Sequence, residues 1–357
     1  MDEQLQDLLK GMQTSNASDL HLTPGKEPQY RISGDLVPVK NDPLTPDRCQ
    51  TMLYSVLDEH SRKAFEQEKE LDFSVGLPGE GRFRVNIYMQ RGSMAAAFRR
   101  LPFEIPDFEE LGLPVERMES LASTDKGMIL VTGATGSGKS TTLASMIDYI
   151  NRHYSKHIIC LEDPIEYIYK HQKATVNQRE VGQDTYSFPG ALRYVLRQDP
   201  DVVQIGEMRD QESIRSMLTV AETGHLAFST LHTNTAPSTI TRIIDVFPQE
   251  QQEQIRVQLS MTLHAVISQQ LVPHANGKEL VLAYELMLTN SAIRNIIRQN
   301  QKHQLYGQIQ LNTGKGMQTM NASLARLVKT GKITRETAEL KCTDAKELQG
   351  LLRRDAT

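Results

Sequence analysis

The chain has 357 residues, of which 39% are hydrophobic, and it carries a formal net charge of −4 at neutral pH. A chain of this length can bury a sizeable core and is expected to divide into two or three domains. Its slight negative charge provides no overall attraction to nucleic acid or anionic lipid, so nucleic acid is not an expected partner. Its three cysteines lie far apart, and neither a disulfide framework nor a paired-cysteine zinc site is predicted.

The first hundred residues alternate short helical and strand-like segments, and an α/β domain is expected over residues 1–100. Within it, residues 82–89 alternate polar and apolar side chains, and the same alternation resumes over residues 94–98. The intervening Gln-Arg-Gly-Ser predicts the turn of a β-hairpin. Three prolines then indicate a linker over residues 101–118, namely Pro102, Pro106 and Pro114.

Apolar runs separated by segments of helical length follow the linker, and they predict a parallel α/β sheet over residues 119–290. The runs cover residues 128–132, 157–161, 202–206 and 226–230. A late β-hairpin is expected around Asn276-Gly277, and residues 291–357 are expected to be mostly helical. No run of about 18 apolar residues occurs and the amino terminus is polar, so the sequence predicts a cytoplasmic protein without a signal peptide.

The residues GATGSGKS form a complete G-x-x-x-x-G-K-[ST] motif between a predicted strand and a predicted helix. Backbone N–H groups of such a loop wrap a phosphate, Lys139 would reach the β- and γ-phosphates, and the Ser140 hydroxyl would ligate Mg²⁺. A Gly/Ser-rich loop without a ligand is the alternative, which the strand-loop-helix setting disfavours. The predicted nucleotide-binding residues are Gly133, Ala134, Thr135, Gly136, Ser137, Gly138, Lys139, Ser140 and Thr141.

Two carboxylates follow predicted strands, at the edge where ligands bind to parallel sheets. Glu162 closes one apolar run, where a general base would activate water. Glu207 follows the next run, where it would hold Mg²⁺ through water. The alternatives are a turn cap at Glu162 and a solvated loop carboxylate at Glu207.

The stretch AETGHLAFSTLHTN places His225 and His232 at the two ends of a short apolar run that fits a buried strand. A zinc site would need a third and a fourth ligand at workable spacing, and the nearby sequence lacks a convincing set. The residues alone leave an acid/base pair, ligand sensing and simple polar strand edges as open interpretations.

Arginines gather on the predicted hairpin of the first domain. Arg82 and Arg84 share one strand face by the period of two, and Arg91 and Arg99 follow around the turn. The pattern predicts a compact cationic group in a chain of net negative charge. Solvated arginines on a sheet edge are the alternative.

These motifs, taken in order, resemble those of one family. GATGSGKS, LEDPIEY, GEMRD and GHLAFSTLHTN are similar to the Walker A, aspartate, Walker B and histidine boxes of the secretion ATPases that power type II secretion and type IV pili. The segment SDLHL near the start extends the resemblance over nearly the whole chain, and AIRNIIR resembles a motif of the members that retract the pilus. Pilus-extending members typically carry a paired-cysteine zinc insertion and a longer amino-terminal region, and neither is present here.

Two residues depart from the family pattern. Gln204 stands where an aliphatic residue is usual, and Gln299 follows AIRNIIR where an acidic residue is common. Neither departure removes a predicted catalytic group. Both leave open a specialised accessory paralogue.

The resemblance implies a RecA-like P-loop core preceded by a PAS-like α/β domain and followed by a helical tail. It implies an ATPase that binds ATP and Mg²⁺, assembles as a homohexamer and retracts a type IV pilus from the cytoplasmic face of the inner membrane. Its implied partners are an inner-membrane platform protein and a second retraction ATPase. The resemblance also implies that His232 senses the γ-phosphate, that His225 supports the neighbouring acidic groups, and that amino-terminal arginines reach the nucleotide of the next subunit, the candidates being Arg84, Arg91 and Arg99.

Three alternatives to a pilus-retracting motor remain at this point. An accessory retraction ATPase would share nearly all of these motifs. A nucleotide-binding regulator would bind ATP without turnover that depends on the oligomer, and the presence of Glu162 disfavours it. A RecA-like nucleic-acid motor could use the arginines as a phosphate track, but the chain lacks a clear alternation of aromatic and basic residues.

Overall fold

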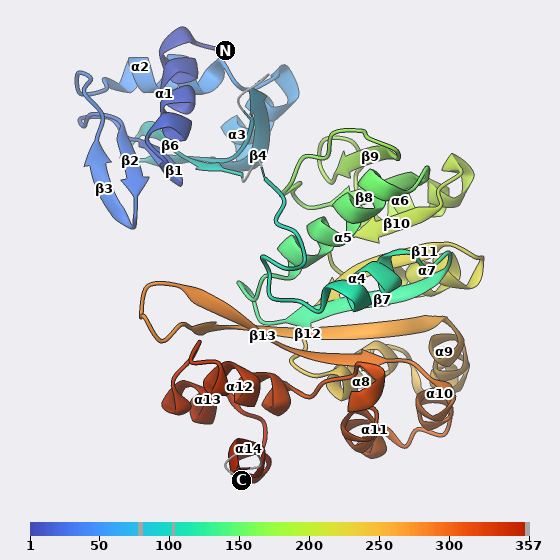
Figure 1. Ribbon diagram of the computed structural model, residues 1–357. Helices are drawn as coiled ribbons and strands as arrows, with labels where there is room; N and C mark the ends of the chain where they lie inside the picture. Colours follow the sequence, from blue (N-terminus) through green and yellow to red (C-terminus); the bar gives the residue numbers. More distant parts are fainter. Residues whose placement is uncertain (78–80, 102–103, 354–357) are drawn as a thin grey trace. The chain divides into compact units, whose positions relative to one another are not determined.

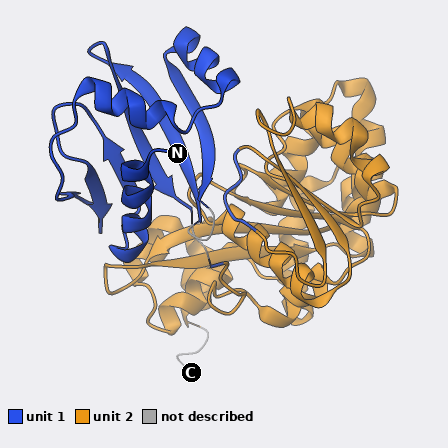
Figure 2. Cartoon of the chain, turned by 90° about the horizontal axis from the view of Figure 1, so that it is seen from above, with its two compact units in different colours: residues 1–104, 164–168 blue, residues 105–163, 169–357 orange. Residues whose placement is uncertain are grey.

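The computed structural model describes residues 1–77, 81–101 and 104–353 (Figure 1). The chain divides into two compact units, one made of residues 1–104 and 164–168 and the other of residues 105–163 and 169–357 (Figure 2). Pro102 of the predicted linker and the last four residues of the predicted helical tail lie outside the described residues. No helix in the described ranges is both long enough and apolar enough to cross a bilayer.

The amino-terminal unit is built on a six-stranded sheet in the order β3-β2-β1-β6-β5-β4, with every neighbouring pair antiparallel. The predicted hairpin is confirmed as β5 and β6, whose turn places Arg91 and Gly92 at φ 47° and 76°. The strands are β1 (Asp19–Leu22), β2 (Gln29–Ile32), β3 (Asp35–Pro38), β4 (Glu70–Leu77), β5 (Gly81–Gln90) and β6 (Ser93–Arg100). The helices are α1 (Glu3–Thr14), α2 (Pro46–Tyr54) and α3 (Glu59–Glu68).

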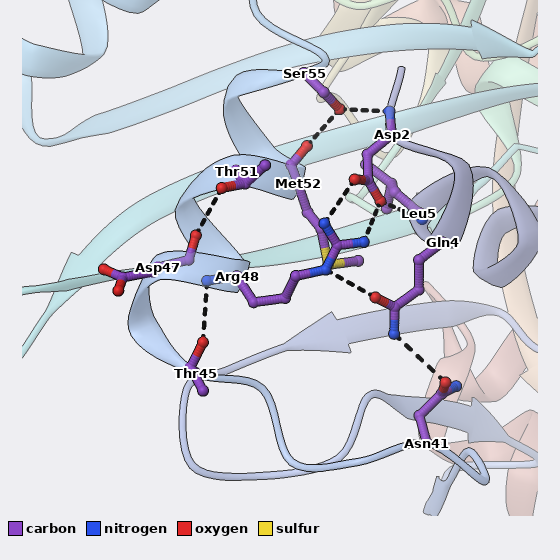
Figure 3. Close-up of polar contacts among 10 residues, drawn as sticks. All are labelled: Asp2, Gln4, Leu5, Asn41, Thr45, Asp47, Arg48, Thr51, Met52 and Ser55. Atoms are coloured by element: carbon purple, nitrogen blue, oxygen red, sulfur yellow. Dashed lines mark hydrogen bonds and ion pairs between the residues drawn. The ribbon is translucent and has the colours of Figure 1, made fainter.

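Arg48 of α2 contacts the start of α1 (Figure 3). Arg48 donates to both carboxylate oxygens of Asp2, at 2.7 Å each, and to Gln4 Oε1 at 2.9 Å. Asp2 also caps α1, since its Oδ1 accepts the Leu5 N–H at 3.2 Å. This bidentate ion pair fixes the first turn of α1 against α2. Leu5 and Leu9 of α1 are fully buried in the core of the unit.

The second unit contains a seven-stranded sheet in the order β13-β12-β7-β11-β10-β8-β9. All neighbours are parallel except β12 and β13, which form the predicted late hairpin. Its central strands read as apolar runs because they are buried along their whole length. The strands are β7 (Gly127–Gly133), β8 (His157–Glu162), β9 (Thr175–Glu180), β10 (Val202–Ile205), β11 (Leu226–Leu231), β12 (Leu263–Pro273) and β13 (Leu280–Leu288).

One helix of this unit, α4, precedes the first strand β7, and the others either connect the parallel strands or form the carboxy-terminal region. The connecting helices include α5 and α7, which both pack on β7 and β11. Those before β12 are α4 (Val115–Ala122), α5 (Lys139–His153), α6 (Phe188–Val195), α7 (Gln211–Glu222), α8 (Ala236–Asp245) and α9 (Gln249–Thr262). Those after β13 are α10 (Ser291–Arg298), α11 (Leu305–Leu311), α12 (Met320–Lys329), α13 (Arg335–Lys341) and α14 (Ala345–Arg353).

The parallel register brings the carboxyl ends of β7, β11, β10, β8 and β9 to one edge of the sheet. Ligands bind to parallel sheets outside this edge, because the loops and helix N-termini converge there. The loops that carry the P-loop motif, His232 and Glu207 all leave the sheet at this edge, where Glu162 also lies.

Candidate functional site

The P-loop connects the end of β7 to the start of α5 and has a conformation that requires glycine. Gly133 has φ 146°, and a Cβ added there would lie 2.4 Å from the Gln269 carbonyl oxygen and 2.5 Å from Ser137 Oγ. Gly138 caps α5 at φ 87°, in the left-handed region. The loop can therefore turn its backbone N–H groups inward, next to the positive end of a 15-residue helix.

Two polar side chains of the loop point to a phosphate ligand. Lys139 is almost fully buried, and its Nζ donates to the carbonyl oxygens of Gly133 and Ala134 at 2.9 Å each. Ser137 Oγ is buried and has no hydrogen-bond partner among the residues that the structure describes. A phosphate group would satisfy the Ser137 hydroxyl and would attract the Lys139 ammonium, since its oxygens accept several hydrogen bonds. Ser140 and Thr141 lie on the first turn of α5 and are partly exposed. The loop residues Ala134, Thr135 and Gly136 are exposed.

A cavity of about 480 Å³ adjoins the P-loop on the side of the β12–β13 hairpin. Gly138, Thr141 and Thr142 line it from α5. Leu271 of β12 and Leu282 of β13 contribute apolar surface. The lining is mixed, because Glu109, Glu110, His274, Glu279 and Lys332 also contribute to it. A hollow with apolar and polar walls next to a phosphate loop could take the nucleoside part of a nucleotide.

Glu162 is the last residue of β8 and is only 7% exposed. Its Oε1 accepts a hydrogen bond from Gln178 Nε2 of β9, at 3.0 Å. This buried, hydrogen-bonded position at the ligand edge differs from that of a solvated turn cap.

Glu207 lies two residues beyond the end of β10 and is contacted from two sides. Arg209 Nε is 2.9 Å from Glu207 Oε2, and His232 Nε2 is 3.1 Å from Glu207 Oε1. The Glu207 side chain is 18% exposed, so it is not a freely solvated loop carboxylate. His232 follows β11, the strand next to β10, and the structure thus brings two of the predicted site residues together.

His225 lies at the opposite edge of the sheet, so its predicted place beside the acidic groups is wrong. It precedes β11, and its carbonyl oxygen accepts from Gly127 N–H at the first residue of β7, whereas the P-loop follows the last. Its Nδ1 lies 3.1 Å from Thr223 Oγ1. The seven residue steps from His225 to His232 span roughly 23 Å along a strand. His232 is the histidine that contacts an acidic group.

Three of the predicted arginines, Arg82, Arg84 and Arg99, lie on one face of the amino-terminal sheet, whereas Arg91 lies apart from them. Arg84 of β5 and Arg99 of β6 are direct register partners, so both lie on one face of the sheet and both are exposed. Arg99 Nε is 2.9 Å from Asp19 Oδ1 of β1. Arg91 is at the hairpin turn, seven residue steps or roughly 23 Å from Arg84, because each strand residue advances about 3.3 Å.

Three polar residues of the region were not predicted from the sequence. Gln178 contacts Glu162, Arg209 contacts Glu207, and Gln269 is fully buried under the P-loop, where its Nε2 donates to Thr142 Oγ1 at 2.7 Å. Arg209 could have been identified by its place in GEMRD. The other two lie on strands whose neighbours are set by the sheet order, which sequence spacing does not show.

No group of three or more His, Cys, Asp or Glu side chains suited to a metal ion occurs within the described ranges.

Comparison with known proteins agrees with this architecture. A family model described as "Type II/IV secretion system protein" matches residues 2–340. The chain belongs to this family. It is 45% identical over 335 residues to the "Type IV pilus retractation ATPase PilT" of Pseudomonas aeruginosa, which covers 94% of this chain and 97% of the relative. It is also 40% identical over 346 residues to the "Type IV pilus ATPase PilU" of the same organism, covering 97% and 90%.

A solved structure extends the likeness to three dimensions. The crystal structure of the pilus retraction motor PilT with bound ADP superposes with a TM-score of 0.90 at 52% identity, covering 97% of this chain and 98% of that one. The predicted α/β fold, with a P-loop core preceded by an amino-terminal domain, is thereby confirmed.

Proposed function

We propose that this chain is a Mg²⁺-dependent ATPase that works as a homohexameric motor and retracts type IV pili. The observation that carries the proposal is a complete P-loop on the same sheet edge as Glu162, Glu207 and His232, in a chain 45% identical to a pilus retraction ATPase over 94% of its length. The Ser137 hydroxyl, which has no partner within the described part of the chain, and the adjoining cavity support nucleotide binding.

In this proposal each group at the edge has one role. The P-loop N–H groups and Lys139 bind the phosphates, and the cavity beside α5 takes the nucleoside. Glu162 accepts a proton from water as the water oxygen bonds to the γ-phosphorus and the bond to the bridging oxygen breaks, which yields ADP and phosphate. His232, held at Glu207, senses the γ-phosphate. His225 is left out of the site.

The residues present fit Mg²⁺ in the manner of other P-loop enzymes. The Ser140 hydroxyl lies on the first turn of α5, and Glu207 would act through a water molecule, since Arg209 and His232 already contact its two oxygens. When bound, the ion would neutralise part of the charge on the β- and γ-phosphates. Arg209 and His232 would then orient Glu207 toward that water.

The proposed assembly supplies the rest of the site. Arg84 or Arg99 of one subunit would act on the nucleotide of the next, which makes hydrolysis depend on ring geometry. The motor would lie at the cytoplasmic face of the inner membrane, on a platform protein of the pilus machine. A second retraction ATPase is a further candidate partner.

Deletion of the gene in its host tests the function directly. Cells that lose retraction are expected to carry more pili and to stop twitching, whereas cells that lose pilus extension would be bald. The purified hexamer is expected to hydrolyse ATP without stimulation by single-stranded DNA. Strong stimulation would instead favour a nucleic-acid motor.

An accessory retraction ATPase is the second candidate, favoured by the 40% identity to PilU over 97% of the chain. The two candidates differ in what they do alone. A principal motor is expected to restore twitching in a strain that lacks every other retraction ATPase. An accessory motor would restore it only when the principal motor is present.

A further inference from the structure

Gln178 extends from the edge strand β9 to the proposed general base. Strands β8 and β9 pair in parallel, with Cys160 opposite Gln178 and Glu162 opposite Glu180. Because side chains alternate along a strand, Gln178 lies on the same face of the sheet as Glu162. Its Nε2 is 3.0 Å from Glu162 Oε1, within normal hydrogen-bond distance.

A second hydrogen bond fixes the orientation of the Gln178 amide. The backbone N–H of Tyr169 lies 3.0 Å from Gln178 Oε1. A backbone N–H can only donate, so the amide oxygen must face Tyr169. The NH₂ group must then face Glu162, where it can only donate to the carboxylate. Rotation of the amide by 180° would break both contacts.

The hydrogen bond from Gln178 restricts the orientation of the Glu162 carboxylate, which is the proposed general base. Glu162 is only 7% exposed, and bulk water therefore does little to orient it. A general base must lie within hydrogen-bond reach of the proton that it removes. A displacement of about 1 Å at a reacting group can cost about 100-fold in rate.

We infer that Gln178 is a positioning residue for ATP hydrolysis, which holds the Glu162 carboxylate in the orientation required to activate water. This inference rests on the proposed role of Glu162 as the base. Gln178 itself touches neither nucleotide nor water in this scheme. Tyr169 contributes through its backbone N–H, so a change of its side chain leaves the hydrogen bond in place.

The test compares Gln178→Leu with Asn177→Leu in the full-length hexamer. Leucine keeps the approximate volume of Gln178 but cannot donate to Glu162. Asn177 precedes it on β9, is exposed and lies on the opposite face, where its Nδ2 contacts His157. Gln178→Leu is expected to lower kcat by about 10- to 100-fold while the KM and Kd for ATP, the hexamer and the melting temperature stay near wild type. Asn177→Leu is expected to hydrolyse ATP normally.

A double-mutant cycle with Glu162→Gln separates positioning from a general structural effect. If Gln178 acts only through Glu162, then Gln178→Leu has no further effect on hydrolysis in the Glu162→Gln chain. A further loss there, or a parallel loss of ATP binding, would overturn the inference. A wild-type kcat for the Gln178→Leu hexamer would also overturn the inference. If Glu162→Gln were inactive in the same experiment, the proposed function would still stand. Wild-type hydrolysis by Glu162→Gln would refute the proposed base and the inference together.

Discussion

His232 Nε2 lies 3.1 Å from Glu207 Oε1, and the two residues follow adjacent parallel strands of the sheet. Partners that orient groups around a metal commonly contribute 10- to 100-fold to metal affinity or activity. We expect His232→Ala to raise the Mg²⁺ concentration for half-maximal ATPase activity by about 10-fold or more. His225→Ala is the matched control and should behave like wild type, because His225 lies at the far end of β11. The measurement is the ATPase rate as a function of Mg²⁺ concentration. An equal rise of the half-maximal Mg²⁺ concentration in both variants would contradict the assignment of His232, and not His225, to the site.

Glu162→Gln should keep ATP binding and lose hydrolysis. The amide cannot accept the proton from water, and a general base typically contributes 10² to 10⁴ in rate, so hydrolysis should fall by at least about 100-fold. Lys139→Ala should lose both binding and turnover, because it removes the cation that meets the phosphates. Equilibrium binding of ATP and steady-state hydrolysis, measured on the same preparations, distinguish the two.

Glu285 predicts a pH dependence of stability. This residue of β13 is fully buried, its Oε1 accepts the N–H of Ala236 at 2.7 Å, and burial raises its pKa from 4.5 to about 7. Between pH 4.5 and about 7 the Glu285 carboxyl therefore keeps its proton in the folded chain but has lost it in the unfolded chain. The free energy of unfolding has its full contribution from Glu285 below pH 4.5, and this contribution is lost as the pH rises through about 7. The difference corresponds to about 3 kcal/mol.

Glu285→Gln should remove that dependence, because an amide is neutral at every pH. The melting temperature of the wild type relative to Glu285→Gln is expected to be higher at pH 5 than at pH 8. Glu279→Gln, at an exposed position just before β13, serves as the control and should follow the wild type. A constant difference between wild type and Glu285→Gln across this range would contradict the raised pKa.

Mixed rings test whether an arginine acts across a subunit boundary. Arg84→Ala is a cleaner variant than Arg99→Ala, since Arg99 also pairs with Asp19 within its own unit. Arg84→Ala and Glu162→Gln chains should each be nearly inactive. Mixed together, they should regain activity at interfaces where an intact arginine meets an intact glutamate. A flat response at the parental level across all mixing ratios, after subunit exchange has been verified, would mean that the arginine acts within its own chain.

Arg294 should separate pilus retraction from ATP hydrolysis. It lies on α10, and its Nη1 donates to the carbonyl oxygen of Met261 near the end of α9, at 3.1 Å. Met261 is close to His264, which lies beside Gly127 at the amino end of β7 and thus at the edge opposite the P-loop. Arg294→Ala should keep the hexamer and most ATPase activity but abolish twitching in cells. Loss of assembly would indicate a purely structural helix, and exposed Arg298→Ala on the same helix is the comparison.

The sequence predicted most of the core sheet because its inner strands are apolar along their whole length. It missed β9, whose residues TVNQRE are mainly polar because the strand lies at the sheet edge. The contact of Gln178 with Glu162 was missed with it. The motif order located the P-loop, Glu162 and Glu207, since each follows a strand of the same direction.

The errors at His225 and Arg91 have one physical cause. Both residues are near their expected partners in sequence. The distance between two residues of a β-strand, however, grows by about 3.3 Å with each residue between them. His225 and His232 flank one strand and therefore lie at opposite ends of it. Arg91 and Arg84 share one hairpin and lie at its two ends. Spacing along an extended strand predicts separation, whereas contacts depend on strand direction and register.

The division of the chain into units has a practical outcome for protein expression. Residues 164–168 group with the amino-terminal unit although they lie inside the sequence of the other, so the backbone crosses between the units three times (Figure 2). A single cut after residue 104 would separate that unit from five of its own residues. The amino-terminal fragment would then be incomplete, whereas the other fragment would hold its own unit complete and carry residues 164–168 without the unit to which they belong. A circularly permuted or loop-replaced version, with a short linker joining Asp163 to Tyr169, is the rational starting point for expressing the second unit alone.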